Sequence, residues 1–211
     1  MKKQLKKQLD LQFISSIGGG CFGKVFKIVH SNSKQVYALK VFRKNEKINK
    51  QEIETMQSFQ NHPNIVRFIK DISTQEIQGY LMEFCPFGSL SSLVQKNSKF
   101  LEKRKLRLQV MKDIVNGVLA IHERGLVIQD LKMDNILISS DFTAKLCDLG
   151  LAQIPDEQEN VTFNNDIFYL GLIFAELGFL EFAELCSQKD CQKRPSILEV
   201  AEKLKNLDDG L

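Results

Sequence analysis

The chain has little net charge and no long run of apolar residues. Among its 211 residues, 29 lysines and arginines face 26 aspartates and glutamates, which leaves a formal charge of +3. So small a surplus is not typical of a nucleic-acid-binding protein. No apolar stretch approaches the roughly 20 residues that a transmembrane helix needs, and Lys2 and Lys3 lead into no hydrophobic signal segment. We therefore expect no nucleic-acid partner and no membrane span.

Cysteines with metal-binding spacing are also absent from the sequence. The five cysteines are scattered, no CxxC motif occurs, and Cys186 and Cys191 have no histidine near them in the sequence. This pattern argues against structural zinc. It is typical of reduced thiols, so we expect a cytoplasmic location, with the nucleus as the alternative. With 43% hydrophobic and 26% charged residues, the composition is that of a globular protein.

The N-terminal part of the chain has the pattern of a small sheet with one helix. Apolar and polar residues alternate over 13–42, which predicts strands. Residues 46–59 have apolar side chains at helical spacing, and Pro63 ends that pattern. The segments 65–69 and 77–84 suit further strands of the same sheet.

The pattern changes near Cys85–Ser89, and the rest of the chain is mostly helical. Apolar residues repeat at helical spacing over 106–121, which predicts a core helix. Two short strands are expected, at 135–139 and 144–147, and two further helices are expected, at 166–177 and 196–204. The sequence therefore predicts an α+β fold of two lobes, the first a small antiparallel sheet with one main helix and the second mostly α-helical.

A glycine-rich turn lies between the first two predicted strands. Gly18, Gly20 and Gly23 have the spacing GxGxxG, followed after one residue by Val25. Glycine lets backbone amides approach phosphate oxygens, because no Cβ atom intervenes. The dinucleotide-binding form of this motif opens a helix, whereas strand-like residues follow the motif here. Taken alone, the motif would equally suit an ordinary tight turn.

A lysine at the end of the next predicted strand has a candidate countercharge. Lys40 shares a strand with Ala38 and is expected to point inward with it. A buried lysine requires an opposite charge, and Glu52 on the following helix is the natural candidate. Each of these two charges, taken separately, would better suit the solvated surface.

The segments Ile128-Gln129-Asp130-Leu131-Lys132-Met133-Asp134-Asn135 and Asp148-Leu149-Gly150 complete an ordered series of motifs. With the glycine turn, Lys40 and Glu52, the chain resembles a eukaryotic protein kinase of the serine/threonine type from about Phe13 to Leu204. The resemblance implies a basic extension at 1–12, a kinase domain at 13–205 and a tail at 206–211. Within the domain it implies an N-lobe at about 13–84, a hinge at 85–89 and a truncated C-lobe at 90–205.

The resemblance also implies roles for individual residues. Gly18, Gly20 and Gly23 would cover the phosphates of ATP, and Lys40, paired to Glu52, would hold the α and β phosphates. Asp130 would accept the proton of the substrate hydroxyl, Lys132 would stabilise the transferring phosphoryl group, and Asn135 and Asp148 would ligate Mg²⁺. The adenine slot and its hinge would be formed by Val25, Ala38, Leu137, Met82 as gatekeeper, Glu83 and Cys85.

The chain departs from the family pattern around and after the catalytic loop. The loop begins with Ile128-Gln129 in place of His-Arg, and glutamine cannot form the ion pair with a phosphorylated activation loop that the arginine forms. Asp148 and Asp166 are only 18 positions apart, and no Ala-Pro-Glu element lies between them. Arg194 follows Asp166 by 28 positions, so that most of the helix that docks protein substrates is missing. Arg194 normally pairs with the absent glutamate, so we expect it to find Glu157 or Glu159 or to stay in water.

Three functions follow from this combination of complete motifs and missing segments. The first is an ATP- and Mg²⁺-dependent protein kinase that phosphorylates serine and threonine. The alternative is a weak or inactive pseudokinase that binds ATP and acts as a scaffold or regulator of a protein partner. The third, a kinase of small molecules, fits least well, because His62-Pro63-Asn64-Ile65 and Gly88-Ser89-Leu90 resemble protein kinases specifically.

Overall fold

The computed structural model describes residues 10–20, 23–42, 50–74, 78–96 and 98–207. The chain divides into two compact units. Unit 1 comprises Met1–Asn61 and Val66–Cys85, and unit 2 comprises His62–Ile65 and Pro86–Leu211. Within the described ranges, no helix has the length and apolar character that a membrane crossing requires.

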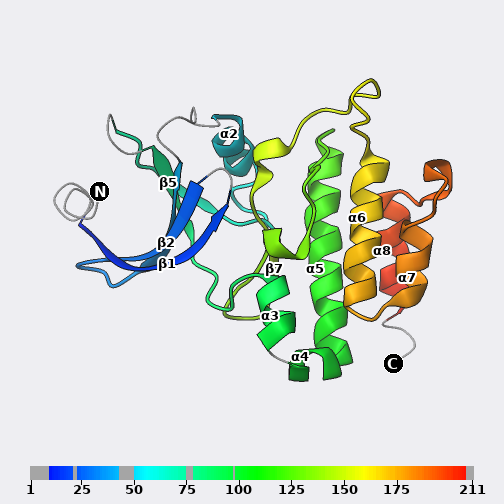
Figure 1. Cartoon of the computed structure of the whole chain (residues 1–211), viewed down its shortest axis with the longest axis horizontal. Coiled ribbons are helices and arrows are strands. Elements are labelled where there is room, and N and C mark those ends of the chain that lie inside the picture. Colours follow the sequence, from blue (N-terminus) through cyan, green and yellow to red (C-terminus); the bar gives the residue numbers. More distant parts are fainter. Residues whose placement is uncertain (1–9, 21–22, 43–49, 75–77, 97, 208–211) are drawn as a thin grey trace. The chain divides into compact units, whose positions relative to one another are not determined.

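Unit 1 is an antiparallel sheet with one described helix. The sheet has the strand order β1-β2-β3-β5-β4 (Figure 1). Its strands are β1 (Leu11–Gly20), β2 (Gly23–His30), β3 (Val36–Phe42), β4 (Phe68–Asp71) and β5 (Gly79–Glu83), and the helix is α2 (Lys50–Ser58). The predicted N-terminal sheet is therefore confirmed.

Alternating side chains of the strands form the core of unit 1. Six buried residues form one cluster on the sheet: Leu11, Phe26, Ile28, Leu39, Ile72 and Leu81. On α2 and just after it, Ile53, Met56 and Phe59 are buried, as their helical spacing predicts. The first residues of the predicted helix, 46–49, lie outside the described residues, as does the start of the strand predicted at 77–84.

One predicted strand is shifted. The segment 65–69 was expected to be a strand, but β4 begins only at Phe68. Ile65 belongs to unit 2, where it forms an isolated parallel bridge with Leu146. The apolar run is therefore divided between the two units, a division that the alternation of residue types does not reveal.

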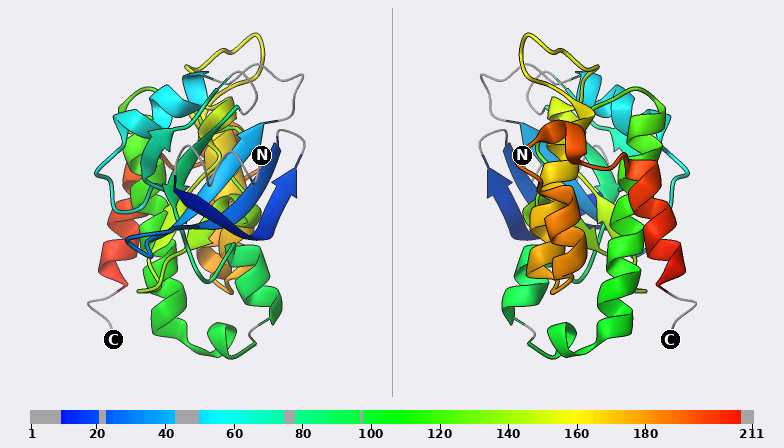
Figure 2. Two further views of the ribbon diagram at one scale, coloured as in Figure 1. Left: turned by 90° about the vertical axis from the view of Figure 1, so that its left-hand side faces the viewer. Right: turned by 90° about the vertical axis from the view of Figure 1, so that its right-hand side faces the viewer.

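Unit 2 is mostly helical, as predicted. Its helices are α3 (Leu90–Lys96), α4 (Ser98–Glu102), α5 (Arg104–Glu123), α6 (Phe163–Glu176), α7 (Leu180–Cys186) and α8 (Ile197–Asn206). Two short strands, β6 (Ile136–Ile138) and β7 (Ala144–Leu146), pair with each other. Figures 1 and 2 show α8 beside α5 and α7 beside α6.

The long helix α5 approaches its neighbours closely at one glycine. A Cβ atom at Gly117 would lie 2.9 Å from the carbonyl oxygen of Asn64 and 2.9 Å from Leu146 Cδ1. The side-chain amide of Asn64 donates to the carbonyl of Ala144 at 3.1 Å, and the carboxylate of the buried Asp113 on α5 accepts from the Ala144 amide at 2.9 Å. These contacts fix the β6–β7 hairpin on α5, and this hairpin ends next to the loop that carries Asp148.

Candidate functional site

The glycine-rich turn is a hairpin between β1 and β2. Gly18 pairs with Val25 and Gly20 with Gly23, while the tip at 21–22, which includes Cys21, lies outside the described residues. A Cβ atom at Gly23 would lie 2.3 Å from the carbonyl oxygen of Val41, so the packing of β2 against β3 itself requires glycine there. At Gly18 the nearest atom would be Val25 Cβ at 3.8 Å, an ordinary contact. Packing within the sheet therefore does not explain the glycine at position 18.

Lys40 and Glu52 form a buried ion pair in unit 1. Lys40 Nζ donates to Glu52 Oε1 at 2.6 Å, and the side chains are 9% and 2% exposed. The same oxygen accepts a hydrogen bond from the hydroxyl of Tyr80 at 2.7 Å. A buried charge pair is held in place only when further hydrogen bonds satisfy it. Tyr80, on β5, therefore supports the orientation of Glu52 and, through it, of Lys40.

The residues assigned to the adenine slot lie on both units. In unit 1, Ala38 on β3 and Met82 on β5 are direct cross-strand partners, and both are buried. Val25 on β2 is half-buried, and Cys85 is buried at the end of the unit. Leu137 lies on β6 of unit 2 and is half-buried.

Glu83 makes two contacts with Arg67. Its amide donates to the carbonyl of Arg67 at 3.0 Å, and its carboxylate accepts from the Arg67 amide at 2.7 Å. Both the amide and the carboxylate of Glu83 are therefore engaged by the backbone of Arg67.

The catalytic loop of unit 2 brings three of the predicted residues together around Asp130. Lys132 Nζ donates to both carboxylate oxygens of Asp130, at 2.8 Å and 2.7 Å. The side-chain amide of Asn135 donates to the backbone carbonyl of Asp130 at 3.0 Å and to its Oδ2 at 2.9 Å. The hydrogen bond to Asp130 raises the pKa of Lys132 above its ordinary value, and the charges of Asp130, Asp148 and Asp134 act in the same direction.

Asn135 and Asp148 offer the oxygen atoms that magnesium prefers. The side-chain nitrogen of Asn135 donates to Asp130, and its side-chain oxygen is the type of atom that can bind a cation. The backbone amide of Cys147, next to Asp148, donates to the carbonyl of Asn135 at 2.9 Å, which places the two segments next to each other. Magnesium is commonly held by one or two carboxylates together with substrate phosphates. The donor set present therefore fits magnesium, although no group of three or more His, Cys, Asp or Glu side chains occurs among the described residues.

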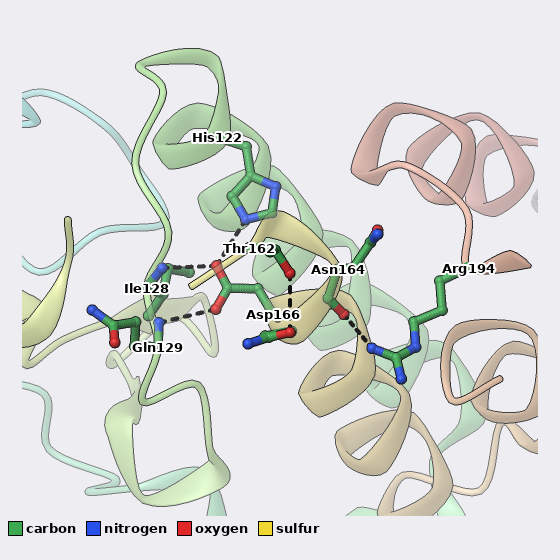
Figure 3. A network of polar contacts seen from close by, with 8 residues as sticks. His122, Ile128, Gln129, Thr162, Asn164, Asp166 and Arg194 are labelled. Atoms are coloured by element: carbon green, nitrogen blue, oxygen red, sulfur yellow. Dashed lines mark hydrogen bonds and ion pairs between the residues drawn. The ribbon is translucent and has the colours of Figure 1, made fainter. Parts of the chain in front are cut away.

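Asp166 at the start of α6 holds the first two residues of the catalytic loop. Its carboxylate is fully buried and accepts from the backbone amides of Ile128 at 2.7 Å and Gln129 at 3.0 Å (Figure 3). His122 Nε2 donates to the same carboxylate at 2.8 Å. Sequence reasoning assigned no role to Asp166 or His122. The available signal was an acidic residue directly before the apolar run that begins at Ile167.

Arg194 binds no carboxylate among the described residues, so the expectation that it finds Glu157 or Glu159 is wrong. It donates to the carbonyl of Asn164 at 2.8 Å (Figure 3). It also donates to the carbonyl of Gln188 at 2.9 Å, and its guanidinium lies 4.9 Å from the centre of the Phe168 ring. Glu157 and Glu159 are exposed. Backbone carbonyls and an aromatic face satisfy the guanidinium instead.

Comparison with known proteins identifies the family. The family model "Protein kinase domain" matches residues 11–171. A rat protein, "Interferon-induced, double-stranded RNA-activated protein kinase", is 31% identical over 209 aligned residues, which cover 80% of this chain and 40% of that protein. "Protein kinase C eta type" of mouse is 28% identical and covers 68% of this chain. "Probable serine/threonine-protein kinase kinX" of Dictyostelium discoideum is 32% identical and covers 73% of it.

These relatives are much longer proteins. The chain spans 40% of the length of the rat protein, 22% of the mouse protein and 14% of the Dictyostelium protein. What they share with it is the kinase domain, which the family model matches over most of the 211 residues. The chain therefore belongs to the protein kinase family.

Proposed function

We propose that this protein transfers the γ-phosphoryl group of ATP to serine and threonine hydroxyl groups of proteins, with Mg²⁺ as cofactor. The observation that carries the proposal is the arrangement around Asp130, where Lys132 and Asn135 both donate to one carboxylate. A similarity of about 30% to proteins named as serine/threonine kinases supports the choice of hydroxyl substrate.

The carboxylate of Asp130 is the proposed proton acceptor for the substrate hydroxyl. Asn135 donates one hydrogen bond to this carboxylate and one to the Asp130 backbone carbonyl, and Asp166 fixes the backbone of the two preceding residues. A positioned base of this kind contributes roughly two to four orders of magnitude in rate. Lys132 keeps its positive charge, because its pKa is raised, and would offset the negative charge of the transferring group.

Lys40 is the proposed ligand of the α and β phosphates, and Glu52 and Tyr80 hold it in place. The glycines of the β1–β2 hairpin, including Gly18, Gly20 and Gly23, would approach the phosphates through backbone amides. Asn135 and Asp148 would hold Mg²⁺, which supplies positive charge to the phosphate oxygens. The adenine ring would contact Val25, Ala38, Met82 and Leu137 and the backbone of Glu83 and Cys85.

A second function is favoured by the short segment after Asp148. Only 18 positions separate Asp148 from Asp166, and this leaves little chain to hold a peptide. A protein with this segment could bind ATP and act as a scaffold or regulator of a partner protein without efficient transfer to it. In that case bound nucleotide would still stabilise the fold by mass action.

The deciding experiment measures transfer of label from γ-labelled ATP with magnesium to a generic basic protein and to the chain itself. It compares wild type, Asp130→Asn and the control Asp134→Asn, which changes an exposed acid of the same loop. Transfer that survives in Asp134→Asn and falls by about two orders of magnitude or more in Asp130→Asn supports the kinase. Equal, background transfer in all three proteins, together with calorimetric binding of magnesium-ATP, would establish the scaffold.

A further inference from the structure

Gln129 joins three parts of unit 2. Its backbone has a φ of 68°, in the left-handed region that a residue with a side chain rarely adopts. Its amide donates to Asp166 Oδ1 on α6 at 3.0 Å, and its side-chain Nε2 donates to the carbonyl of Leu151 at 2.5 Å. The conformation of this residue therefore connects the catalytic loop to α6 and to the segment that follows Asp148.

Further backbone hydrogen bonds, which carry no net charge, hold the same segment. The backbones of Val127 and Gln153 exchange two hydrogen bonds, at 2.7 Å and 3.0 Å, and the amide of Ala152 donates to the carbonyl of Leu149 at 3.2 Å. Gln129 thus adds a side-chain contact to Leu151, which lies in the sequence between Asp148 and the Gln153 that pairs with Val127.

The sequence of this region contains no cation that could bind a phosphate. From Leu146 to Gln188 there is no lysine, arginine or histidine, whereas Asp156, Glu157 and Glu159 are acidic. A phosphate added to the segment would meet negative charge on its own stretch of chain, and Gln129 can offer it no ion pair.

We propose that Gln129 is a positioning residue whose side-chain amide holds the Leu149–Gln153 segment, and with it Asp148, against the catalytic loop without any phosphate. Its relevance to catalysis rests on the proposed kinase function, whereas the tether itself is a property of the fold. An amide-to-carbonyl bond needs no modification to form, so the segment would be held without a phosphorylation step. Because neither partner carries a charge, salt hardly weakens the bond.

Hydrogen exchange of the segment tests the tether without any assay of activity. Gln129→Glu keeps the shape of the side chain but turns a carboxylate oxygen toward the Leu151 carbonyl. Gln129→Asn keeps the amide and introduces a residue that tolerates positive φ, but it shortens the reach of the side chain by one methylene. The matched control is Gln188→Glu, because Gln188 Nε2 also donates to a backbone carbonyl, that of Glu184, at 2.7 Å.

The amides of Ala152 and Gln153 are expected to exchange roughly threefold to tenfold faster in both Gln129 variants, which corresponds to the loss of one hydrogen bond. They should exchange at the wild-type rate in Gln188→Glu. Phosphatase treatment of wild type should leave the exchange unchanged. Wild-type exchange in Gln129→Asn would overturn the proposal, as would faster exchange after phosphatase treatment. Should Gln129→Glu fail to fold, Gln129→Asn decides alone.

Label transfer, measured in parallel, separates this proposal from the proposed function. If wild type transfers no label but the Gln129 variants exchange faster, the tether is upheld and the kinase function is rejected. If wild type transfers label and all variants exchange at the wild-type rate, the kinase function is upheld and the tether is rejected. If both proposals hold, wild type transfers label equally with and without phosphatase treatment, and the exchange is faster in Gln129→Asn.

Discussion

Tyr80 donates its hydroxyl hydrogen bond to the same Oε1 atom of Glu52 that binds Lys40. Both residues are almost fully buried, so water cannot replace the bond in a variant. We expect Tyr80→Phe to lower the free energy of unfolding by about 1.5–3 kcal/mol, the range for hydrogen bonds to charged groups. Urea unfolding measures the change. Tyr37→Phe, on the neighbouring strand β3, is the control, and equal losses in the two variants would contradict this assignment.

Two glycines of the β1–β2 hairpin should respond differently to a methyl group. Gly23→Ala places a Cβ 2.3 Å from the Val41 carbonyl oxygen and should destabilise the protein by about 1–3 kcal/mol through overpacking. Gly18→Ala meets only ordinary contacts, so its melting temperature should stay near that of wild type while its affinity for ATP falls. Unchanged ATP affinity of a folded Gly18→Ala protein, measured by calorimetry, would count against the phosphate role of this glycine.

His62 should make the stability depend on pH. Its Nδ1 accepts from the backbone amide of Asn64 at 3.2 Å, and burial, together with Lys145 and Arg124, lowers its pKa below 6.5. The folded state therefore binds fewer protons than the unfolded state just below 6.5, so stability falls as the pH drops through this window. In His62→Asn, whose side-chain oxygen can still accept from a nearby amide, this part of the decline should disappear. Urea unfolding of both proteins at about pH 7.5 and 5.5 measures it.

The cysteines should differ widely in their reactivity with alkylating agents. Burial raises the pKa of the Cys186 thiol to about 12, whereas Cys191 is exposed. Because the thiolate is the reacting form, native protein should be modified at Cys191 first and at Cys186 only after unfolding. Mass spectrometry of timed samples gives the order, and early modification of Cys186 would show that α7 opens readily.

ATP with magnesium should slow the alkylation of Cys147. This half-buried residue precedes Asp148, the proposed magnesium ligand. Cys191, an exposed cysteine outside the motifs assigned to ATP, serves as an internal control whose rate should not change. Equal rates at Cys147 with and without nucleotide would argue that ATP does not bind near Asp148.

The sequence predicts the architecture well where one pattern extends over many residues. The alternation over 13–42 gave three strands and the spacing over 106–121 gave α5, since both patterns repeat several times. The helix α7 was not predicted, because seven residues hold too few turns for helical spacing to stand out. The helix predicted to start at Asp166 begins at Phe163 and has Thr162 as its N-cap, a favoured residue type at that position that the prediction did not use.

For the candidate site, sequence reasoning found the pair that lies within known motifs but missed the residues that hydrogen-bond to the motif residues and hold them in place. Lys40 and Glu52 were expected to pair, and the structure joins them at 2.6 Å. Tyr80 was missed, because it reaches Glu52 from a strand 28 residues further along the chain. Asp166 was missed as an acceptor, because its partners are backbone amides, which every residue except proline offers and no sequence distinguishes.

The turn between Asp156 and Val161 returns the chain to the place where it left. The two residues exchange backbone hydrogen bonds of 2.8 Å and 2.7 Å, and Asp156 Oδ1 accepts from the Gln158 amide inside the turn at 2.9 Å. Because this closure is complete at its base, residues could be inserted within the turn while the segments on either side kept their positions. The turn could therefore be lengthened, for example by grafting a peptide-binding segment into it, without changing the contacts that orient Asp130.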